Sequence, residues 1–282
     1  MKEKLLSLFI ILSSCLFVQA QEDSLNVNRY VMRATMVGAG YANVFDSYLS
    51  PLEYSGPEVR FLFENMRMTH LMDGNVSAQH LFQINFAYTD NISKSAKGYS
   101  GLINWSYALH YQKSYADRFK LLFGPMLDIN AGVIYNRRNS NNPAQAKAYA
   151  NLGASAMAIY KFHIKNYPLV VRYQANLPFM GIMFSPEYGE SYYEIFGLKN
   201  GGKNVLFTSV HNTPSLRQLL TLDLPIRNTI LRVGYVCDIQ QAKVNHLKSH
   251  AYSHNFMIGF VRNIFLIKGK KQVCMPSSVT PY

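Results

Sequence analysis

The most constraining feature of this 282-residue chain is the stretch NVSAQHLFQINFAYT, residues 75–89. Alternate positions carry apolar side chains such as Phe82 and Phe86, and the positions between them carry polar side chains such as Gln83 and Asn85. A β-strand sends successive side chains to opposite faces, so this pattern predicts a strand with one apolar and one polar face. Ordinary globular strands have ~5–6 residues. A tilted strand that crosses a bilayer needs ~9–11 residues, and this stretch is long enough to do so.

The same alternation recurs along the chain and predicts an outer-membrane β-barrel, an all-β, antiparallel transmembrane barrel of about twelve strands. Its connections alternate between long and short, except at 213–215, as in barrels with short periplasmic turns and longer external loops. An even number of strands places both chain ends in the periplasm. The expected strands cover about 29–40, 58–70, 75–89, 100–112, 119–135, 147–163, 169–177, 192–198, 204–212, 216–224, 229–240 and 253–266.

The N-terminus predicts export. Lys2 and Lys4 precede an apolar run, and Val18-Gln19-Ala20 forms a small-residue cleavage site, so residues 1–20 are predicted to be a cleavable signal peptide. A lipoprotein signal ending before Cys15 is the alternative. No later stretch approaches the ~18 unbroken apolar residues of a spanning helix, so a membrane-spanning form must be a closed barrel. We expect a barrel domain over 21–267, a basic periplasmic tail over 268–282 and a location in the cell outer membrane.

Composition narrows the partners. The chain has 20 Tyr and 17 Phe against one Trp, and tyrosine suits the boundary between lipid and water. The formal net charge of +12 favours anionic headgroups or acidic solutes. The cations are scattered singly, which argues against nucleic acid. We expect outer-membrane lipid, the barrel-assembly machinery that reads the last strand, and a small polar or anionic solute as partners. No cofactor is expected, and no Cys–His cluster has metal-ligand spacing.

A soluble secreted all-β binding protein is the alternative class. A lipocalin-like barrel would have an apolar inward face and a wet outward face. Here the apolar face of the strands is the longer and more aromatic one. Twelve such strands around a dry interior would leave many polar groups without partners. Of the two cysteines beyond the signal peptide, Cys237 falls in the apolar phase of a strand, where a thiol needs no partner. A disulfide to Cys274 stays open.

Two stretches carry a resemblance to a known family. They are YLSPLEYSG, residues 48–56, and FSPEYGESYYEIF, residues 184–196. The chain resembles an uncharacterised family of Bacteroides-type outer-membrane proteins, a domain of unknown function, over nearly the whole mature chain. The resemblance implies a barrel and an outer-membrane location. It implies no activity, substrate or catalytic residue.

Both stretches are expected in long external loops, because six strands separate them and six crossings return the chain to the same side. Together they supply tyrosines and carboxylates, which suit recognition of sugars or polar headgroups. Alternatively, these loops fold over the mouth and plug the barrel. The candidate ligand-binding residues are Tyr48, Glu53, Tyr54, Glu187, Tyr188, Tyr192 and Tyr193.

The enzyme alternative is a phospholipase-like lipid hydrolase. Outer-membrane phospholipase also has twelve strands, and it needs a Ser beside a His with an oriented Asn. Ser209 and His211 share one face of an expected strand, with Asn212 adjacent, and Ser106 and His110 share a face of another. The phospholipase pattern places its Ser two residues after its His, the reverse of the order here, and its Gly-bearing motif is absent. We therefore expect a structural, ligand-binding or narrow transport protein without catalysis.

Charged residues on the polar faces predict the state of the lumen. Paired with each other, they would fill and rigidify a narrow barrel, whereas unpaired arginines would select anions. A twelve-stranded barrel is intermediate between filled and open barrels, and we expect the filled form. The residues concerned are Arg33, Arg60, Arg172, Arg217 and Arg232, with Asp128, Asp223 and Asp238 as available partners.

Overall fold

The computed structural model describes residues 30–115, 118–139, 142–165, 167–197, 201–226, 229–266 and 272–274. The expected signal peptide, with Cys15, lies outside the described residues. The elements are β1 (Tyr30–Asp46), β2 (Tyr54–Met68), β3 (Val76–Asn91), β4 (Lys97–Tyr115), β5 (Phe119–Asn136), β6 (Ala144–Ile164), β7 (Tyr167–Phe184), α2 (Tyr192–Gly197), η2 (Gly201–Asn204), β8 (Val205–Ser209), β9 (Ser215–Ile226), β10 (Thr229–Val244), β11 (Leu247–Leu266) and β12 (Gln272–Cys274).

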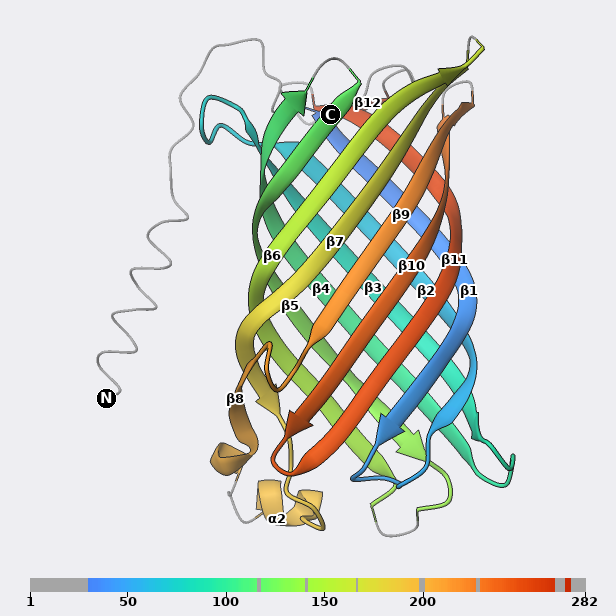
Figure 1. Ribbon diagram of the computed structural model, residues 1–282, viewed down its shortest axis with the longest axis vertical. Coiled ribbons are helices and arrows are strands. Elements are labelled where there is room, and N and C mark those ends of the chain that lie inside the picture. The colour runs from blue at the N-terminus through green and yellow to red at the C-terminus, as the bar shows by residue number, and fades with distance from the viewer. Residues whose placement is uncertain are drawn as a thin grey trace, which may run out of the picture.

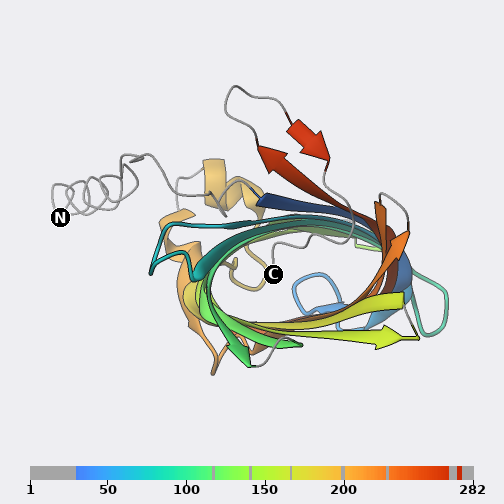
Figure 2. The same ribbon diagram turned by 90° about the horizontal axis from the view of Figure 1, so that it is seen from above.

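The strands close into one antiparallel barrel (Figure 1). Each strand from β1 to β7 pairs with the next, β9 to β11 continue the series, and β11 pairs with β1 from Tyr30↔Phe265 to Asp46↔Ser249. The sheet has twelve strands; without β8 and β12, which pair only with β7 and β11, ten remain in the closed barrel. Seen from above, these strands surround a single lumen (Figure 2).

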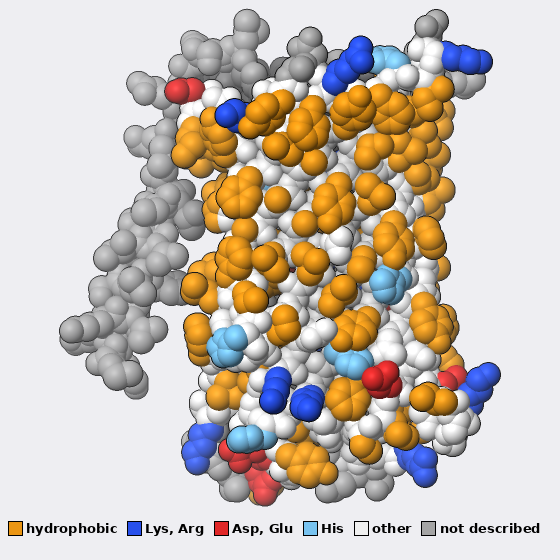
Figure 3. Space-filling view, in the orientation of Figure 1, with side chains coloured by type: hydrophobic (Ala, Val, Ile, Leu, Met, Phe, Trp, Pro, Cys, Tyr) orange, Lys and Arg blue, Asp and Glu red, His pale blue; other side chains and the backbone are white. Residues whose placement is uncertain are grey.

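The alternation that predicted the barrel also sets its two faces. On β3, Gln79 and Gln83 are buried in the lumen, whereas Phe86 on the opposite phase is 57% exposed. Hydrophobic side chains cover the middle of the outer surface in Figure 3, and charged side chains gather at its two ends. The expectation of polar side chains inside and apolar side chains outside is confirmed on this strand.

The expected strand at 192–198 is wrong, because residues 192–197 form α2. Ser191 and Glu194 make a capping box, in which the Glu194 carboxylate accepts hydrogen bonds from the Ser191 amide at 2.7 Å and hydroxyl at 2.9 Å. The Glu194 amide donates to the Ser191 hydroxyl oxygen in return. These bonds satisfy amides that a helix start leaves unpaired. The Ser-x-x-Glu spacing was the helix signal that the strand interpretation missed.

The expected hairpin turn at 213–215 is also wrong. β8 pairs with Met180–Phe184 and β9 pairs with Val170–Asn176, so both run along the same edge of β7 in the same direction. The intervening residues bend the chain without reversing it. One false strand and one false reversal therefore turn an expected twelve-stranded barrel into a ten-stranded one. The strand number stays even, so both ends of the barrel sheet lie on the same side.

Two smaller expectations need correction. On β1, Met32 and Met36 point into the lumen and Arg33 lies exposed on the outer face, the reverse of the expected phase. Because the filled lumen needs apolar as well as polar side chains, polarity alone cannot assign the phase of such a strand. The expected loop before β11 is a two-residue turn at Asn245 and His246, whose φ values of 54° and 61° are those of a type I′ hairpin.

The two distinctive loops lie at the same end of the barrel, as the six intervening strands predicted. The Tyr48 hydroxyl donates a hydrogen bond to the Glu190 carbonyl oxygen at 2.6 Å. β12, in the expected tail, pairs with the end of β11. Neither helix among the described residues has the length and hydropathy to cross a membrane.

We expect Phe82→Arg to destabilise the barrel, because it places a charge on the apolar outer face. A cation near the middle of the apolar band costs ~2–4 kcal/mol. Leu71→Arg makes the same chemical change at an exposed turn residue and is expected to have little effect. The folded fraction in lipid vesicles, measured by electrophoresis without heating, checks this. Equal loss in both variants would contradict the assignment of the outer face.

Candidate functional site

In the half of the lumen that lies farther from the Tyr48 and Tyr192 loops, here called the inner half, the side chains are organised around one carboxylate, Glu64 on β2. Arg172 on β7 binds both of its oxygens at 2.6 Å, and Arg232 on β10 donates to it at 2.7 Å. Arg232 also forms a paired contact with Asp223 on β9 at 2.5 and 2.6 Å. All four side chains are buried. This inner ionic layer joins strands on opposite sides of the lumen, since β2 neighbours neither β7 nor β10.

A second ionic layer lies nearer the mouth. Arg60 contacts Glu58 at 3.0 Å and Asp238 at 3.2 Å. Arg217 contacts Asp238 at 3.1 Å and Asp128 at 3.0 Å. Buried amides and hydroxyls complete the hydrogen bonding of these charges. They come from Gln83, Asn104, Ser106, Asn130, Ser253 and Asn255.

Three apolar clusters alternate with the two ionic layers. Along β2, Met66 belongs to the innermost cluster, Glu64 follows, Leu62 belongs to the middle cluster, and Arg60 and Glu58 come next. The innermost cluster consists of Met32, Ala34, Met66, Leu122, Met157, Ile159, Ile230 and Val261. The middle cluster consists of Met36, Leu62, Leu81, Leu219, Val236 and Met257. The cluster at the mouth consists of Ala42, Val44, Tyr48, Leu49, Ala87, Ile134 and Leu247.

This layering makes the pairing of charges obligatory. A charge between apolar layers loses its hydration and is tolerated only with a close partner and further hydrogen bonds. Among the described residues, the two layers hold four arginines and five carboxylates, so the buried charges nearly cancel. The structure therefore has a filled lumen, as expected from the sequence.

Most of these lumen charges were predicted from the sequence. All the expected arginines except Arg33 lie in the lumen, and the three expected aspartates pair with them. Arg33 lies on the outer face. Sequence reasoning missed Glu58 and Glu64, although the alternation along β2 places both on the same face as Arg60.

The predicted mouth residues divide into two groups. Tyr48, Tyr54 and Tyr192 close the barrel: the Tyr48 and Tyr192 rings meet edge to face at 6.5 Å, and the Asn136 amide donates to the Tyr54 hydroxyl at 3.0 Å. Burial, reinforced by Tyr192 and nearby carboxylates, raises the pKa of Tyr48 to about 12. Tyr48 therefore keeps its proton, and with it the hydrogen bond that it donates to the Glu190 carbonyl oxygen, even in moderately alkaline solution.

The remaining predicted residues point to solvent. Tyr188 is 77% exposed and Tyr193 is 75% exposed, and Glu187 is also exposed. The Glu53 carboxylate is also exposed and accepts a hydrogen bond from Asn43 at 3.2 Å. The structure thus brings the two stretches together at the mouth, but it separates buried tyrosines that close the barrel from exposed ones that a ligand could reach. The binding role of these residues stays a prediction.

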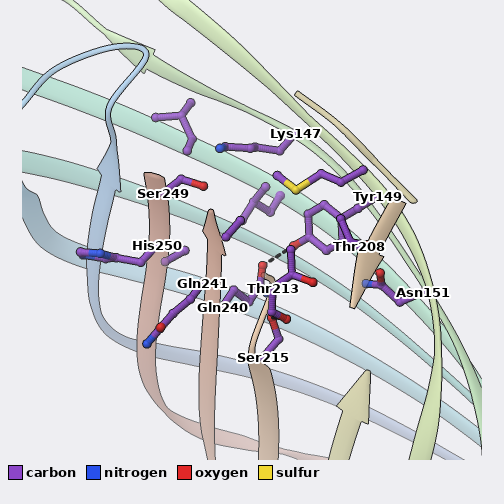
Figure 4. A pocket seen from close by; sticks show the side chains of 15 residues that line it. Lys147, Tyr149, Asn151, Thr208, Thr213, Ser215, Gln240, Gln241, Ser249 and His250 are labelled. Carbon is purple, nitrogen blue, oxygen red and sulfur yellow. Dashed lines mark hydrogen bonds between the residues drawn. The ribbon is translucent and has the colours of Figure 1, made fainter. Parts of the chain in front are cut away.

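A cavity of about 50 Å³ lies beneath the mouth, beside the bend between β8 and β9 (Figure 4). Tyr149 donates a hydrogen bond to Gln240 across it. The Lys147 ammonium on its lining contacts the Asp46 carboxylate at 2.5 Å. Drug-sized ligands need pockets of ~300–1,000 Å³, so this cavity has room for water only.

The two serine–histidine pairs that the sequence suggested have different surroundings. Ser209 and His211 do share a hydrogen bond between the hydroxyl and Nδ1. Asn212 accepts a bond from the Ser209 amide at 2.7 Å and donates to the Phe207 carbonyl oxygen at 3.3 Å. It therefore stabilises the bend in the backbone, and among the described residues its side chain forms no hydrogen bond with the His211 imidazole.

The second candidate pair is separated. The His110 imidazole contacts Ser155 at 2.8 Å, whereas Ser106 donates to Asp128 at 2.9 Å. Both lie buried in the lumen. In the part of the chain that the structure describes, no three His, Cys, Asp or Glu side chains are grouped as a metal site. Cys237 carries a free thiol there.

This closed antiparallel barrel has the fold of the outer-membrane β-barrel proteins. It is similar to the outer membrane protease OmpT from Escherichia coli, with a TM-score of 0.51 and 6% identity over 86% of this chain and 99% of that one. Weaker matches include the transport unit of the autotransporter AIDA-I from Escherichia coli (TM-score 0.43, 8% identity, 88% and 94% covered) and an outer membrane channel from Pseudomonas putida F1 (0.35, 8%, 88% and 100%).

The chain belongs to a family of proteins of unknown function (DUF3316), whose model matches residues 4–271. The expected membership in an uncharacterised family of outer-membrane type is thereby confirmed. A search of curated proteins found no match. The similar structures share the fold at low identity and differ in activity, so they carry no function over to this chain.

We expect Glu64→Ala to be among the most damaging single changes in the lumen. It leaves the Arg172 and Arg232 guanidinium groups close together without their shared carboxylate, and breaking a buried ion pair in this way costs ~3–5 kcal/mol. Glu53→Ala removes a carboxylate that is 55% exposed and serves as the control. Urea unfolding in lipid vesicles, followed by the fluorescence of the single tryptophan, Trp105, measures the free energy of unfolding. A similar small loss in both variants would show that the layer does not stabilise the barrel.

Proposed function

We infer that this protein lies in the outer membrane as a closed barrel that presents its external loops for binding, without a diffusion path and without catalysis. The observation that carries this inference is the filled lumen. Two layers of paired charges and three apolar clusters occupy the space that a pore would leave open. A solute would have to break buried ion pairs in both layers to pass.

The cavities along the lumen support a closed state. Four cavities along the described part of the lumen and its mouth have volumes of about 50, 20, 20 and 10 Å³, each sufficient for one or a few water molecules. The layers are also redundant. Opening the mouth by moving Tyr48 and Tyr192 would leave the inner ionic layer around Glu64 intact, so the seal does not depend on the loops.

The outer surface supports the membrane location. Apolar side chains alternate with the lumen positions on strand after strand, as lipid requires. β11 ends in an alternating series that includes the exposed Phe256, Ile258 and Phe260. That series suits recognition by the barrel-assembly machinery, which would be a partner together with outer-membrane lipid.

The mouth supports a binding role. Tyr188 and Tyr193 expose their rings, and Glu187 exposes its carboxylate, on the segment that Tyr48 and Tyr192 hold in place. Exposed rings and an exposed acceptor on one segment suit a small polar solute such as a sugar. Separating buried anchoring residues from exposed contact residues favours binding, because the backbone that carries the exposed rings is held before a ligand arrives.

The absence of catalysis is the second part of the inference. Ser209 and His211 contact each other, but the amide that could orient the imidazole bonds to backbone instead. A nucleophile and base without an orienting group and without a defined oxyanion site meet only part of what hydrolysis needs.

We expect purified wild-type protein to show no sustained conductance in planar lipid bilayers. The Tyr48→Ala/Tyr192→Ala variant should stay closed, because the ionic layers below the mouth remain. Replacing Glu64, Arg172, Asp223 and Arg232 together by alanine removes equal numbers of positive and negative groups and should also leave the barrel closed, because the second ionic layer remains. Current is expected only when Glu58, Arg60, Arg217 and Asp238 are replaced as well and the mouth variant is included. Stable channels in the wild-type protein, or channels opened by the mouth variant alone, would contradict a seal inside the lumen.

We also expect no release of fatty acid from phospholipid vesicles by the folded protein, and no difference between the wild type, Ser209→Ala and His211→Ala. Release is measured by mass spectrometry of the lipid extract. Hydrolysis by the wild type that both substitutions abolish would overturn this part of the inference, because a nucleophile and its base act as a unit.

A further inference from the structure

Four exposed cations meet on the outside of the barrel at its outer end. Lys94 comes from the connection between β3 and β4, Lys97 is the first residue of β4, and Arg137 and Arg138 come from the connection between β5 and β6. With two small residues they line an open cleft of about 570 Å³, here called the basic cleft. The Arg137 amide donates to the Lys97 carbonyl oxygen at 3.0 Å, and the Arg138 guanidinium reaches Ser95 at 3.5 Å. These contacts hold the two connections together.

The cations of the basic cleft lack acidic partners. Within the described ranges, Lys94, Lys97, Arg137 and Arg138 form no salt bridge, although the lumen arginines and Lys147 all do. Asp90 stands directly opposite Lys97 in the strand register but is not in salt-bridge contact with it. Asp90 acts on Lys97 from beyond salt-bridge distance, and the other three cations have no salt-bridged carboxylate among the described residues. Such a cluster of like charges attracts an anion from outside the protein.

A row of tyrosines gives the depth of the cleft in the membrane. Tyr88, Tyr99 and Tyr135 are register partners across β3, β4 and β5, and the Tyr88 and Tyr99 ring centroids are 5.4 Å apart. On outer-membrane barrels, such rows mark the boundary between hydrocarbon and headgroups. Toward the middle of the barrel from this row, the side chains on the outer surface are apolar. Phe86 is the next residue after Tyr88 on that face of β3.

Lys97 lies immediately beyond this boundary. It is two residues from Tyr99 on the same face of β4, which corresponds to ~7 Å along the strand, and its ammonium lies 5.4 Å from the centre of the Tyr88 ring. Ile92, at the start of the connection between β3 and β4, is 95% exposed and offers an apolar contact beside the charges. The cations are therefore at headgroup depth rather than out in solution.

We propose that the basic cleft binds the phosphate groups of a lipid in the surrounding leaflet, a lipid that carries at least two phosphates. Arginine can bind phosphate through two parallel hydrogen bonds, and lysine adds a mobile point charge. Two pairs of cations, at the β3–β4 and β5–β6 connections, match two phosphates better than one. This binding goes beyond the proposed loop-binding function. It rests on the proposed outer-membrane location but not on a closed lumen, because a conducting barrel could hold the same lipid.

The test compares two triple variants of the full-length protein in detergent micelles. Lys97→Gln/Arg137→Gln/Arg138→Gln removes three charges from the cleft. Lys203→Gln/Lys243→Gln/Lys248→Gln removes three exposed charges elsewhere at the same end of the barrel and is the matched control. The probes are lipid A with two phosphates, lipid A with both phosphates removed, and inorganic phosphate. Native mass spectrometry measures the fraction of the protein that carries bound lipid, and excess lipid or inorganic phosphate serves as the competitor.

Lipid A with two phosphates should bind the wild type and the control variant alike, and it should bind the cleft variant about tenfold or more weakly, given the contribution of each cation near a charged surface. Removing the phosphates from the lipid should weaken binding to the wild type to a similar extent. Equal affinity of all three proteins for the phosphorylated lipid would overturn the proposal. Displacement of the lipid by millimolar inorganic phosphate would overturn the lipid assignment in favour of a soluble anion site.

Discussion

The shared contact of Arg172 and Arg232 with Glu64 is the interaction on which the interior depends. It joins β2 to β7 and β10 across the lumen, where no backbone hydrogen bond can reach. A carboxylate surrounded by apolar side chains keeps its charge only if cations stay beside it, and the cations in turn need the carboxylate. This mutual requirement fixes the relative heights of three strands that are not neighbours in the sheet.

The ionic and apolar layers together explain how a ten-stranded barrel can be filled. Barrels of ~8 strands have an interior that ordinary side chains fill, and wider barrels leave a channel. Here long side chains compensate for the extra width: arginine and glutamate in the ionic layers, and methionines such as Met36, Met66 and Met157 in the apolar clusters. The mouth adds a cover of its own through Tyr48 and Tyr192.

The errors of sequence interpretation were local ambiguities. Residues 192–197 are aromatic and apolar enough to suggest a strand, and only the Ser191–Glu194 capping box indicates the helix. The bend between β8 and β9 contains a proline and turn-forming residues, and without knowledge of the β7 edge it is indistinguishable from a hairpin. On β1, Met32 could face lipid or an apolar layer with equal chemical sense. The lumen arginines and aspartates were predicted because their alternation is regular. Glu64 follows the same alternation, but it was not predicted as the partner of these arginines.

The sequence by itself determined the class of protein and the direction in which most side chains point. Period-two alternation over long strands is a local property, and it excludes spanning helices while placing Arg60, Arg172, Arg217 and Arg232 on the inner face. The tertiary structure decided which charges meet. Contacts such as Arg172 with Glu64, or Arg217 with Asp128, join residues far apart in the chain, and they depend on the strand number and stagger with which the sheet closes. Those quantities arise only from the whole barrel, because a single bend or helix changes the strand number and moves every side chain relative to those across the lumen.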